Sequence, residues 1–265
     1  MNETPPQAFG GRAAPTGGIG SDSPPREEHV RSLLSACEHY PKSDRPLFVA
    51  GYNELCRVDL NGGKVLEVCC GHGELACRLG EIFPGAEVMA MDRYPDAGRA
   101  VADAHQKRTL ENVRYECGDV LRLQSVADES LDLVYGQATL HHLAHDTEAV
   151  GREFSRVLKP GGRLIFIFEP LGHNRLWAMI RAYRIAAAAM PDESNVVIGQ
   201  LDQIAQSFSR YELQLFNVLG YPFKSLGRVA GDSVMDFVCR LDAAMIRRWP
   251  RTGRWAANFN VVFTK

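Results

Sequence analysis

The sequence has no long apolar run and no excess of either charge. Its longest strongly apolar stretch is Leu164 to Phe168, whereas a helix needs roughly 20 apolar residues to cross a bilayer. The N-terminus lacks the basic segment followed by an apolar one that marks a secretory signal peptide. We therefore expect a soluble, cytoplasmic protein.

The charge balance gives no sign of a charged macromolecular partner. Thirty Lys and Arg stand against 32 Asp and Glu, for a net charge of -2, so no global field attracts nucleic acid or an anionic membrane. One basic concentration stands out, formed by Arg247, Arg248, Arg251 and Arg254. The sequence shows no basic amphipathic helix of the bilayer-binding kind. We expect a small-molecule partner, with no nucleic acid and no membrane, and a homodimer remains open.

Cysteine is present without a pattern. The seven cysteines are an odd number, and they contain no CxxC pair and no paired His/Cys spacing of the zinc kind. This predicts reduced thiols and no metal site. The neighbouring Cys69 and Cys70 allow one interpretation as a redox pair. Neighbouring cysteines at a strand end are more commonly small buried side chains without a redox role.

The composition is that of a globular protein with an N-terminal arm. The 265 residues are 45% hydrophobic and 23% charged, enough for one large domain. Residues 1–28 hold five Pro and five Gly with few large apolar side chains, which predicts a disordered arm. Residues 29–60 carry helical spacing in two stretches and are expected to lie over the binding site, and residues 61–265 form the main domain.

From residue 64 the pattern alternates between strand and helix. Strands are predicted over 64–69, 87–91, 113–116, 131–135 and 163–168, with helices over 75–83, 97–110 and 147–158 between them. Lys159 to Gly162 is predicted to end the last of these helices. Residues 171–210 read as mostly helical, followed by strands at 211–219 and 256–264 and a helix near 233–248. The alternation predicts an α/β fold with a parallel sheet.

Four loops follow the predicted strands, at the edge where parallel sheets bind ligands. Glycines follow the first strand, and their missing side chains let backbone N–H groups approach a ligand. An acid ends the second strand about 20 residues later, where it can accept both hydroxyls of a ribose. The four segments are Glu67 to Glu74, Asp92, Gly118 to Val120, and Gly136 to Ala138 with His141 and His142 behind it.

The glycine loop allows two interpretations. Gly71-x-Gly73-x-x-Ala76 with Asp92 fits the relaxed dinucleotide fingerprint of an NAD(P)-dependent oxidoreductase. Against this, Glu67 precedes the turn, and neither the Gly118-Asp119 pair nor the Lys159 to Gly162 segment has a role in that fingerprint.

From Val65 to Pro170 the chain resembles class I S-adenosylmethionine-dependent methyltransferases, in particular the small-molecule group. The segments that carry the resemblance read VLEVCCGHG, VMAMD, CGDV, LDLVYGQATLHHL and VLKPGGRLIFIFEP. The resemblance implies a Rossmann-like, doubly wound, seven-stranded sheet that is mostly parallel. It implies the strand order 3-2-1-4-5-7-6, with the last strand antiparallel, and S-adenosyl-L-methionine as cofactor.

The resemblance also assigns the cofactor site residue by residue. Glu67 and the loop backbone would hold the methionine end, Asp92 the ribose, and Asp119 with Val120 the adenine. The complete set is Glu67, Gly71, Gly73, Asp92, Arg93, Asp119, Val120 and Gln137. The sequence departs from the family at Cys69, where glycine is usual, so the backbone there must tolerate a Cβ atom.

Catalysis and acceptor choice depend on residues beyond the shared motifs. If the acceptor is a hydroxyl or a protonated amine, a histidine near the site would serve as base; we expect His173 or His141. The acceptor pocket is expected from Tyr52, His142, Glu169, Trp177 and Arg181, with residues 171–210 as a lid. These residues predict methyl transfer to an oxygen, nitrogen or carbon atom of a small, apolar or aromatic molecule of biosynthetic or secondary metabolism. The alternative that the protein binds S-adenosylmethionine without catalysis is left open.

Overall fold

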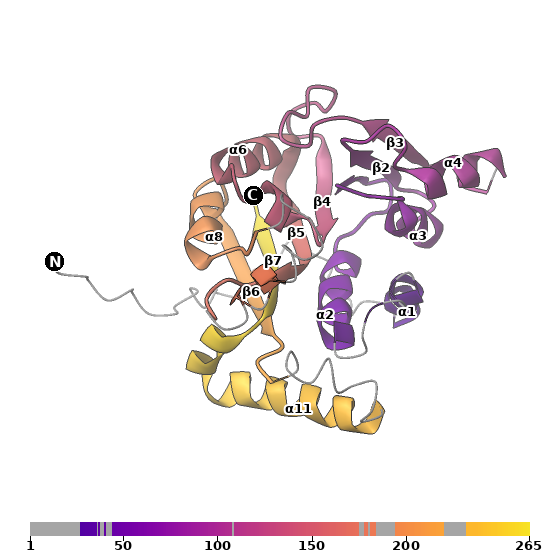
Figure 1. The fold of residues 1–265 in the computed structure, drawn as a ribbon. Coiled ribbons are helices and arrows are strands. Elements are labelled where there is room, and N and C mark those ends of the chain that lie inside the picture. The colour runs from indigo at the N-terminus through magenta and orange to yellow at the C-terminus, as the bar shows by residue number, and fades with distance from the viewer. Residues whose placement is uncertain are drawn as a thin grey trace.

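A computed structural model describes residues 27–35, 37, 40, 44–107, 109–174, 178–179, 181–183, 194–219 and 232–265. Its centre is a seven-stranded sheet of order β3-β2-β1-β4-β5-β7-β6 (Figure 1). The strands are β1 (Lys64–Val68), β2 (Glu87–Asp92), β3 (Val113–Cys117), β4 (Leu131–Gln137), β5 (Leu158–Pro170), β6 (Arg210–Phe216) and β7 (Asn258–Thr264). This confirms the predicted Rossmann-like sheet and its strand order.

Only β7 runs against its neighbours in the sheet. It pairs antiparallel with both β5 and β6, whereas β1 to β5 pair in parallel. The carboxyl ends of the parallel strands therefore meet at one edge, which we call the carboxyl edge. Because β7 runs the other way, it begins at this edge, where Asn258 pairs with Pro170 of β5.

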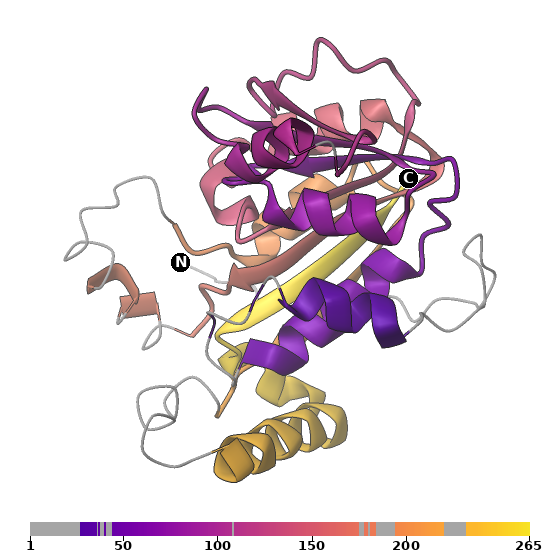
Figure 2. The same ribbon diagram turned by 90° about the vertical axis from the view of Figure 1, so that its right-hand side faces the viewer.

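Helices cover both faces of the sheet. One face carries α1 (Glu27–Ser35), α2 (Arg45–Cys56), α3 (Glu74–Ile82) and α4 (Arg99–Gln106), and the other carries α5 (Leu140–Leu143), α6 (Thr147–Val157) and α8 (Ile198–Ala205). Between β6 and β7 lie α11 (Asp232–Arg248) and a 3-10 helix, η2 (Pro250–Trp255). Figures 1 and 2 show α11 at the bottom of the molecule, apart from both helical layers.

The strand pattern accounts for this layering. Successive strand residues point to opposite faces, so Leu66 packs in the core beneath α6 while Val65 packs in the core beneath α2 and α3. The apolar run Leu164 to Ile167 is fully buried along β5. Such a run is expected of a central strand that is covered on both sides.

The segment Lys159 to Gly162 differs from the prediction. The helix α6 does end, but one residue earlier than predicted, and β5 begins at Leu158 rather than at Arg163. Leu158 is already extended, with φ −74° and ψ 139°, and pairs with Leu131 of β4. Lys159 precedes a proline and is biased toward extended backbone, so this segment continues the strand instead of forming a separate turn. The helix α4 is also shorter than predicted and ends at Gln106.

Two predicted segments fall partly outside the described residues. The arm was predicted to end at residue 28, but Glu27 and Glu28 already form the first turn of α1, and residues 1–26 lie outside the description. Much of the expected lid at 171–210 also lies outside it, although α8 and a bridge between Leu171 and Val196 belong to this segment. No helix in the described ranges is both long and apolar enough to span a membrane.

A buried amide helps to connect α2 to the sheet. Asn260 of β7 is fully buried, and its Nδ2 donates to the carbonyl oxygen of Leu47 in α2 at 2.8 Å. Its Oδ1 accepts from the backbone N–H of Phe168 in β5 at 3.0 Å. Since Phe168 lies two residues before the end of β5, close to the carboxyl edge, Asn260 holds α2 against the part of the sheet where the site forms.

Replacing Asn260 by leucine leaves the Phe168 N–H and the Leu47 carbonyl buried without these partners. We expect Asn260→Leu to lower the free energy of unfolding by about 2–4 kcal/mol, measured by urea denaturation. Asn61→Ala, at an exposed turn position, is the control. A loss for Asn260→Leu no larger than that of the control would contradict the assigned role.

Candidate functional site

The glycine loop after β1 is fastened to the end of β2. The backbone N–H of Gly71 donates to Oδ2 of Asp92 at 3.0 Å, and the N–H of Cys70 donates to the carbonyl of Met91 at 3.1 Å. The Oδ1 of Asp92 accepts from the N–H of Tyr94 at 3.3 Å. Each carboxylate oxygen has a second lone pair, so Asp92 can hold the loop and still accept hydrogen bonds from a ligand.

Glu67 is an unusual buried carboxyl group. It lies in β1 with 4% of its surface exposed, and its Oε2 has no hydrogen-bond partner among the described residues. Burial raises the pKa of this carboxyl to about 8, and the nearby Asp92 adds to the shift, while the Tyr135 hydroxyl and the Ala76 backbone oppose it. A buried carboxyl with an unsatisfied oxygen costs free energy, which a cationic or hydrogen-bond-donating ligand would recover.

Tyr135 lies directly beside Glu67. The two residues pair across β1 and β4 in the parallel register, so their side chains leave the sheet on the same face. Tyr135 is fully buried, and its hydroxyl lies close enough to Glu67 to lower the pKa of that carboxyl, although it completes no hydrogen bond of good geometry within the described part of the chain. Two adjacent polar groups are thus available at the carboxyl edge.

Left-handed backbone marks three neighbouring strand ends. Cys69 after β1, Ala138 after β4 and Phe168 in β5 have φ of 51°, 53° and 65°, values that residues with a Cβ rarely adopt. Such conformations cost of order 1–3 kcal/mol and cluster at functional sites. At Cys69 and Ala138 the chain leaves its strand, whereas at Phe168 the pairing of β5 with β7 shifts register before β5 continues to Pro170.

The glycines of the loop serve two different needs. Gly71 has φ 53°, and a Cβ there would meet no atom within 4 Å, so its backbone faces open space. Gly73 has φ 79°, and a Cβ there would come within 2.9 Å of Val101. Gly71 is therefore open to a ligand, whereas Gly73 is required for packing of the loop against α4.

The predicted adenine and ribose residues lie further along the same edge. The Oδ1 of Asp119 accepts from the N–H of Leu121 at 3.0 Å, while the rest of this side chain is exposed. Val120 is buried. Arg93 is exposed, and its guanidinium lies 5.2 Å from the centre of the Tyr94 ring. Because the N–H of Gly118 donates to the carbonyl of Asp92 at 2.9 Å, the ends of β2 and β3 are held together.

Gln137, at the end of β4, contacts the N-terminal helices. Its Oε1 accepts from the Tyr52 hydroxyl at 2.6 Å, and the Cys37 sulfur lies 2.7 Å from the same hydroxyl and 3.5 Å from Nε2 of Gln137. Tyr52 is fully buried. The predicted approach of Tyr52 to the site is thus consistent with a polar cluster that fastens α2 to the carboxyl edge.

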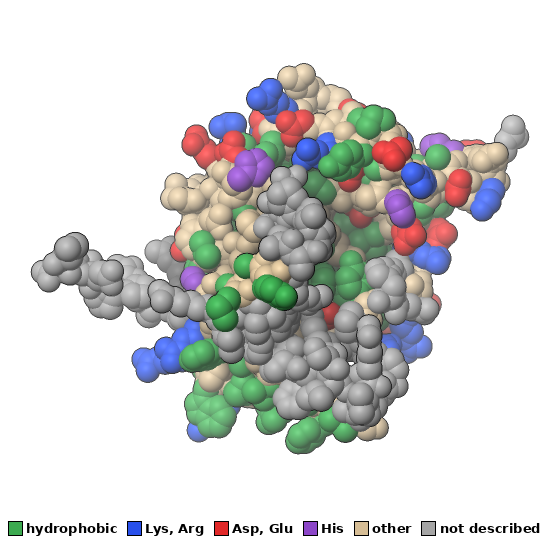
Figure 3. All heavy atoms as spheres, viewed as in Figure 1, with side chains coloured by type: hydrophobic (Ala, Val, Ile, Leu, Met, Phe, Trp, Pro, Cys, Tyr) green, Lys and Arg blue, Asp and Glu red, His purple; other side chains and the backbone are tan. Residues whose placement is uncertain are grey.

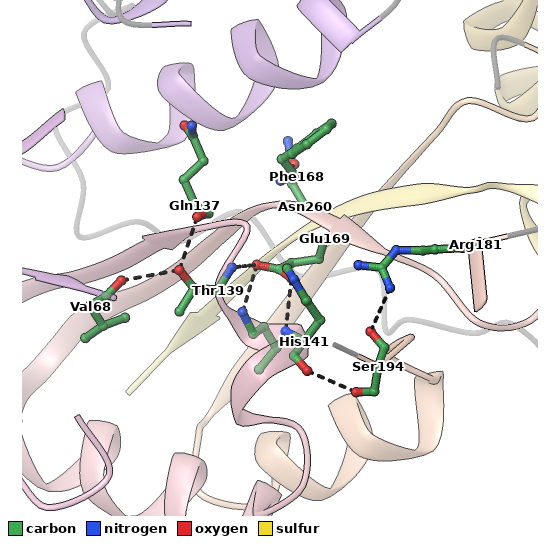
Figure 4. Close-up of polar contacts among 10 residues, drawn as sticks. Val68, Gln137, Thr139, His141, Phe168, Glu169, Arg181, Ser194 and Asn260 are labelled. Atoms are coloured by element: carbon green, nitrogen blue, oxygen red, sulfur yellow. Dashed lines mark hydrogen bonds and ion pairs between the residues drawn. The ribbon is translucent and has the colours of Figure 1, made fainter. Parts of the chain in front are cut away.

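Glu169 organises the turn that follows β4 (Figure 4). It is fully buried, and Oε1 accepts from the N–H groups of Thr139 and Leu140 at 2.7 and 2.9 Å. The Oε2 accepts from the N–H of His141 at 3.2 Å and lies 2.8 Å from the ring Nδ1 of His141. With four donors on its two oxygens, Glu169 positions this turn and does not offer a free carboxylate to an acceptor, as its predicted place in the acceptor pocket had implied.

The remaining predicted residues are dispersed. His141 is buried, and its ring lies beside that of His142 with centroids 4.1 Å apart and the ring planes tilted by 38°. His173 is exposed. Nη1 of Arg181 lies 3.5 Å from the carbonyl of Ser194, whose hydroxyl donates to the carbonyl of His141 at 3.0 Å (Figure 4). Trp177 lies outside the described residues.

The thiols near the site are held in their protonated form. Burial raises the pKa of Cys69 to about 12 and that of Cys70 beyond it, so neither is a nucleophile at neutral pH. Among the described residues, no group of three or more His, Cys, Asp or Glu side chains is arranged to hold a metal ion.

Comparison with known proteins identifies the domain. Residues 66–166 match the methyltransferase domain family, and this range holds the glycine loop, Asp92, Gln137 and the turn held by Glu169. Residues 66–166 therefore resemble a methyltransferase domain. The match ends within β5, before α8, β6, α11 and β7.

Curated relatives share this methyltransferase domain but differ in substrate. A demethylmenaquinone methyltransferase of Deinococcus radiodurans is 36% identical over 45% of this chain and 49% of its own length. A malonyl-[acyl-carrier protein] O-methyltransferase of Bacillus cytotoxicus is 26% identical over 57% of this chain and 48% of its own. The chain thus spans about half the length of the curated relatives it matches.

Solved structures agree with the methyltransferase fold over a larger part of the chain. A phosphoethanolamine N-methyltransferase of Haemonchus contortus aligns with a TM-score of 0.58 and 16% identity, over 90% of this chain and 57% of the other. The geranyl diphosphate C-methyltransferase of Streptomyces coelicolor aligns with a TM-score of 0.55 and 15% identity. This alignment covers 89% of this chain and 87% of the other. At these identities the likeness concerns the fold alone.

Sequence reasoning missed two polar residues of the site. Tyr135 reads as part of an apolar strand, and only its register against β1 places it beside Glu67. Cys37 reads as one position of an amphipathic stripe, and only the packing of the N-terminal helices places it beside Tyr52. Neither residue carries a signal of its own in the sequence, because each becomes part of the site only through a contact between distant segments.

The strained Cys69 gives a testable prediction. A Cβ in the left-handed region costs about 1–2 kcal/mol, so Cys69→Gly should be more stable than Cys69→Ala by about 1 kcal/mol in thermal or urea unfolding. The same pair of changes at Cys77, within the helix α3, should give the opposite order, because glycine is unfavourable there. Equal stability of the two Cys69 variants would show that the turn is not strained.

Proposed function

We propose that this protein is an S-adenosylmethionine-dependent methyltransferase that acts on a small, apolar or aromatic molecule. The observation that carries the proposal is the buried Glu67, whose Oε2 lacks a partner among the described residues beside an open glycine loop. This buried carboxyl supports a binding site for a ligand that has a positively charged group near Glu67 and a ribose near Asp92. The match of residues 66–166 to the methyltransferase domain family gives independent support.

The residues present fit S-adenosylmethionine. Its methionine end carries an ammonium group, which would satisfy the unpaired Oε2 of Glu67. The open backbone at Gly71 leaves room for close approach, and Asp92 can accept from ribose hydroxyls through its remaining lone pairs. Asp119 and Val120 would border the adenine, Arg93 the ribose side, and Gln137 the transferable methyl.

When bound, S-adenosylmethionine supplies a methyl group already activated by its sulfonium. The chain has to align an acceptor and exclude water, and such alignment can supply much of the rate acceleration. Tyr52, Gln137 and Cys37 close one side of the site with the N-terminal helices. Glu169 fixes the turn after β4 on the other side.

Of the two histidines predicted as bases, His141 is the better oriented. Glu169 holds its Nδ1 at 2.8 Å, and no described residue bonds its Nε2. A carboxylate that accepts from Nδ1–H leaves Nε2 as the proton acceptor. We therefore propose His141 as the base for an acceptor hydroxyl or amine, and His173, exposed and without an orienting carboxylate, as a residue outside the chemistry.

The acceptor class follows from chemistry outside the shared domain. The curated relatives named above act on a quinone precursor and on a malonyl thioester carrier, so the shared domain does not determine the acceptor. The apolar neighbours Tyr40, Phe48 and Phe168 pack together close to Gln137, with ring centroids about 5 Å apart. This aromatic group favours an apolar or aromatic acceptor, and a cytoplasmic location stays a prediction.

Binding of S-adenosylhomocysteine should release a proton from Glu67. With a pKa of about 8, the free carboxyl is largely protonated at pH 6.5, and a ligand ammonium would favour the ionised form. We expect about one proton released at pH 6.5 and almost none at pH 9, measured by calorimetry in buffers of different ionisation enthalpy. Affinity should rise up to tenfold per pH unit below pH 8.

The matched variants are Glu67→Gln and Glu74→Gln. Glu74 is exposed in the first turn of α3, so its change should leave the proton release intact, whereas Glu67→Gln should abolish it. Proton release that persists in Glu67→Gln would show that another group binds the ammonium.

The activity itself is tested with S-adenosylmethionine labelled in its methyl group. The protein is incubated with the small-molecule fraction of a cell extract, and the products are separated into organic and aqueous phases. We expect label in organic-soluble product, and at least a tenfold lower rate for Glu67→Gln. Tight binding of S-adenosylhomocysteine without any transfer would favour the non-catalytic binding protein.

A further inference from the structure

The helix α11 exposes apolar side chains along its outer face. Met235 and Val238 face inward and are buried, whereas Val234, Phe237 and Leu241 are 44%, 60% and 44% exposed. These three positions follow the i, i+3, i+7 spacing of a single helical stripe. Figures 1 and 3 show this helix at the lower rim of the molecule, where hydrophobic side chains gather.

Two tryptophans continue this face beyond the helix. Trp249 and Trp255, at the two ends of η2, are 59% and 50% exposed. The guanidinium of Arg248 lies 5.8 Å from the Trp249 ring, and that of Arg254 lies 5.4 Å from the Trp255 ring. Exposed tryptophan beside arginine is typical of surfaces that meet both an apolar phase and anionic groups.

The same surface is strongly basic. Its exposed side chains include five arginines and one aspartate, Asp236, although the chain as a whole has a net charge of -2. The five are Arg240, Arg247, Arg248, Arg251 and Arg254. None of them forms an ion pair with another described residue, so their charge is available to a partner.

We propose that this surface docks on an anionic lipid membrane. We call it the α11 surface, formed by Val234, Phe237, Leu241, Trp249, Trp255 and the five arginines. The apolar stripe would enter the boundary between headgroups and acyl chains, as surface-lying amphipathic helices do. The tryptophans lie at headgroup level, and the arginines pair with anionic headgroups, each contributing to attraction.

Charge favours a membrane over a second copy of the chain. A symmetric dimer would bring two copies of the same basic surface into contact, which places like charges opposite each other. Nucleic acid would satisfy the arginines and could stack on the tryptophans, but it offers nothing to the aliphatic Val234 and Leu241. An anionic leaflet satisfies both the charge and the apolar stripe.

The α11 surface adjoins the carboxyl edge of the sheet. The helix η2 leads directly into β7, whose Asn258 pairs with Pro170 at the end of β5. Nδ2 of Asn174, which follows β5, donates to the carbonyl of Trp255 at 3.2 Å. If the proposed methyl transfer holds, docking would bring the acceptor side of the site near lipid, where apolar acceptors concentrate, but docking itself does not depend on it.

The sequence alone led to the expectation of no membrane partner. In sequence, residues 233–248 were predicted only as a helix, and Arg247, Arg248, Arg251 and Arg254 only as a basic concentration. The fold shows which positions are buried, and these are Met235, Val238 and Asp242, so a second apolar stripe is left on the outside.

The test is binding of the full chain to vesicles of phosphatidylcholine alone or with about one third phosphatidylglycerol. We expect flotation only with the anionic vesicles, falling steeply as salt rises. Phospholipids brominated on their acyl chains should quench tryptophan fluorescence, because Trp249 and Trp255 approach the acyl region. Binding of equal strength to both vesicle types, or none to either, would contradict the proposal.

Matched variants distinguish binding through the α11 surface from non-specific electrostatic or hydrophobic adsorption of the protein. Arg247→Glu with Arg251→Glu, and separately Phe237→Ser, should each weaken vesicle binding at least tenfold. The controls are Arg152→Glu on α6 and Val197→Ser beside α8, both exposed and distant in sequence, which should bind as the unaltered protein does. Thermal unfolding and S-adenosylhomocysteine binding, measured on every variant, show whether the fold and the cofactor site persist.

Two other partners for the α11 surface would give different experimental results. Concentration-dependent dimerisation that Phe237→Ser abolishes would assign the face to a second copy and overturn the proposal. Binding of single-stranded RNA that outcompetes vesicles and depends on the arginines but not on Phe237 would also overturn it. Loss of S-adenosylhomocysteine binding with intact vesicle binding would contradict the proposed enzyme function and leave the membrane surface standing.

Discussion

The site depends on one constraint, a carboxyl group buried at the end of β1 with one oxygen unpaired. Glu67 lies in the central strand β1, whose residues from Val65 to Val68 are buried whichever face of the sheet they point to. Burial raises its pKa to about 8, so the folded chain retains a proton that the unfolded chain releases above pH 4.5. This residue therefore contributes less to stability as pH rises from about 4.5 to 8. A bound cation removes that cost.

The turns around Glu67 serve the same purpose. Strained backbone lies at the ends of β1 and β4, at Cys69 and Ala138, and at the register shift of β5, at Phe168, and buried polar groups hold the chain there. Glu169 fixes the turn after β4, and Asn260 fixes the end of β5 against α2. These fully hydrogen-bonded groups make the edge rigid, so ligand binding is not expected to require ordering of these turns.

The strands and the loops that follow them could be predicted because their signals are local in sequence. The strand order was implied by the resemblance to class I methyltransferases, and the cofactor roles of the loop residues stay predictions. Each strand is followed within a few residues by its loop, and parallel pairing brings those loops to one edge. Contacts between distant segments could not be predicted. The Tyr135–Glu67 register, the Cys37–Tyr52–Gln137 cluster and the four donors on Glu169 each join segments far apart in sequence. Lys159 to Gly162 was misassigned because pairing of Leu158 with Leu131 outweighs its turn-like composition.

The central claim is that the carboxyl edge binds S-adenosylmethionine. The most direct measurement is calorimetric titration of the protein with S-adenosylhomocysteine, in parallel with NADH and NADPH. Our account predicts one site of micromolar affinity for S-adenosylhomocysteine and no heat from either nicotinamide. Binding of a nicotinamide alone would contradict it and would assign Gly71, Gly73 and Asp92 to a dinucleotide.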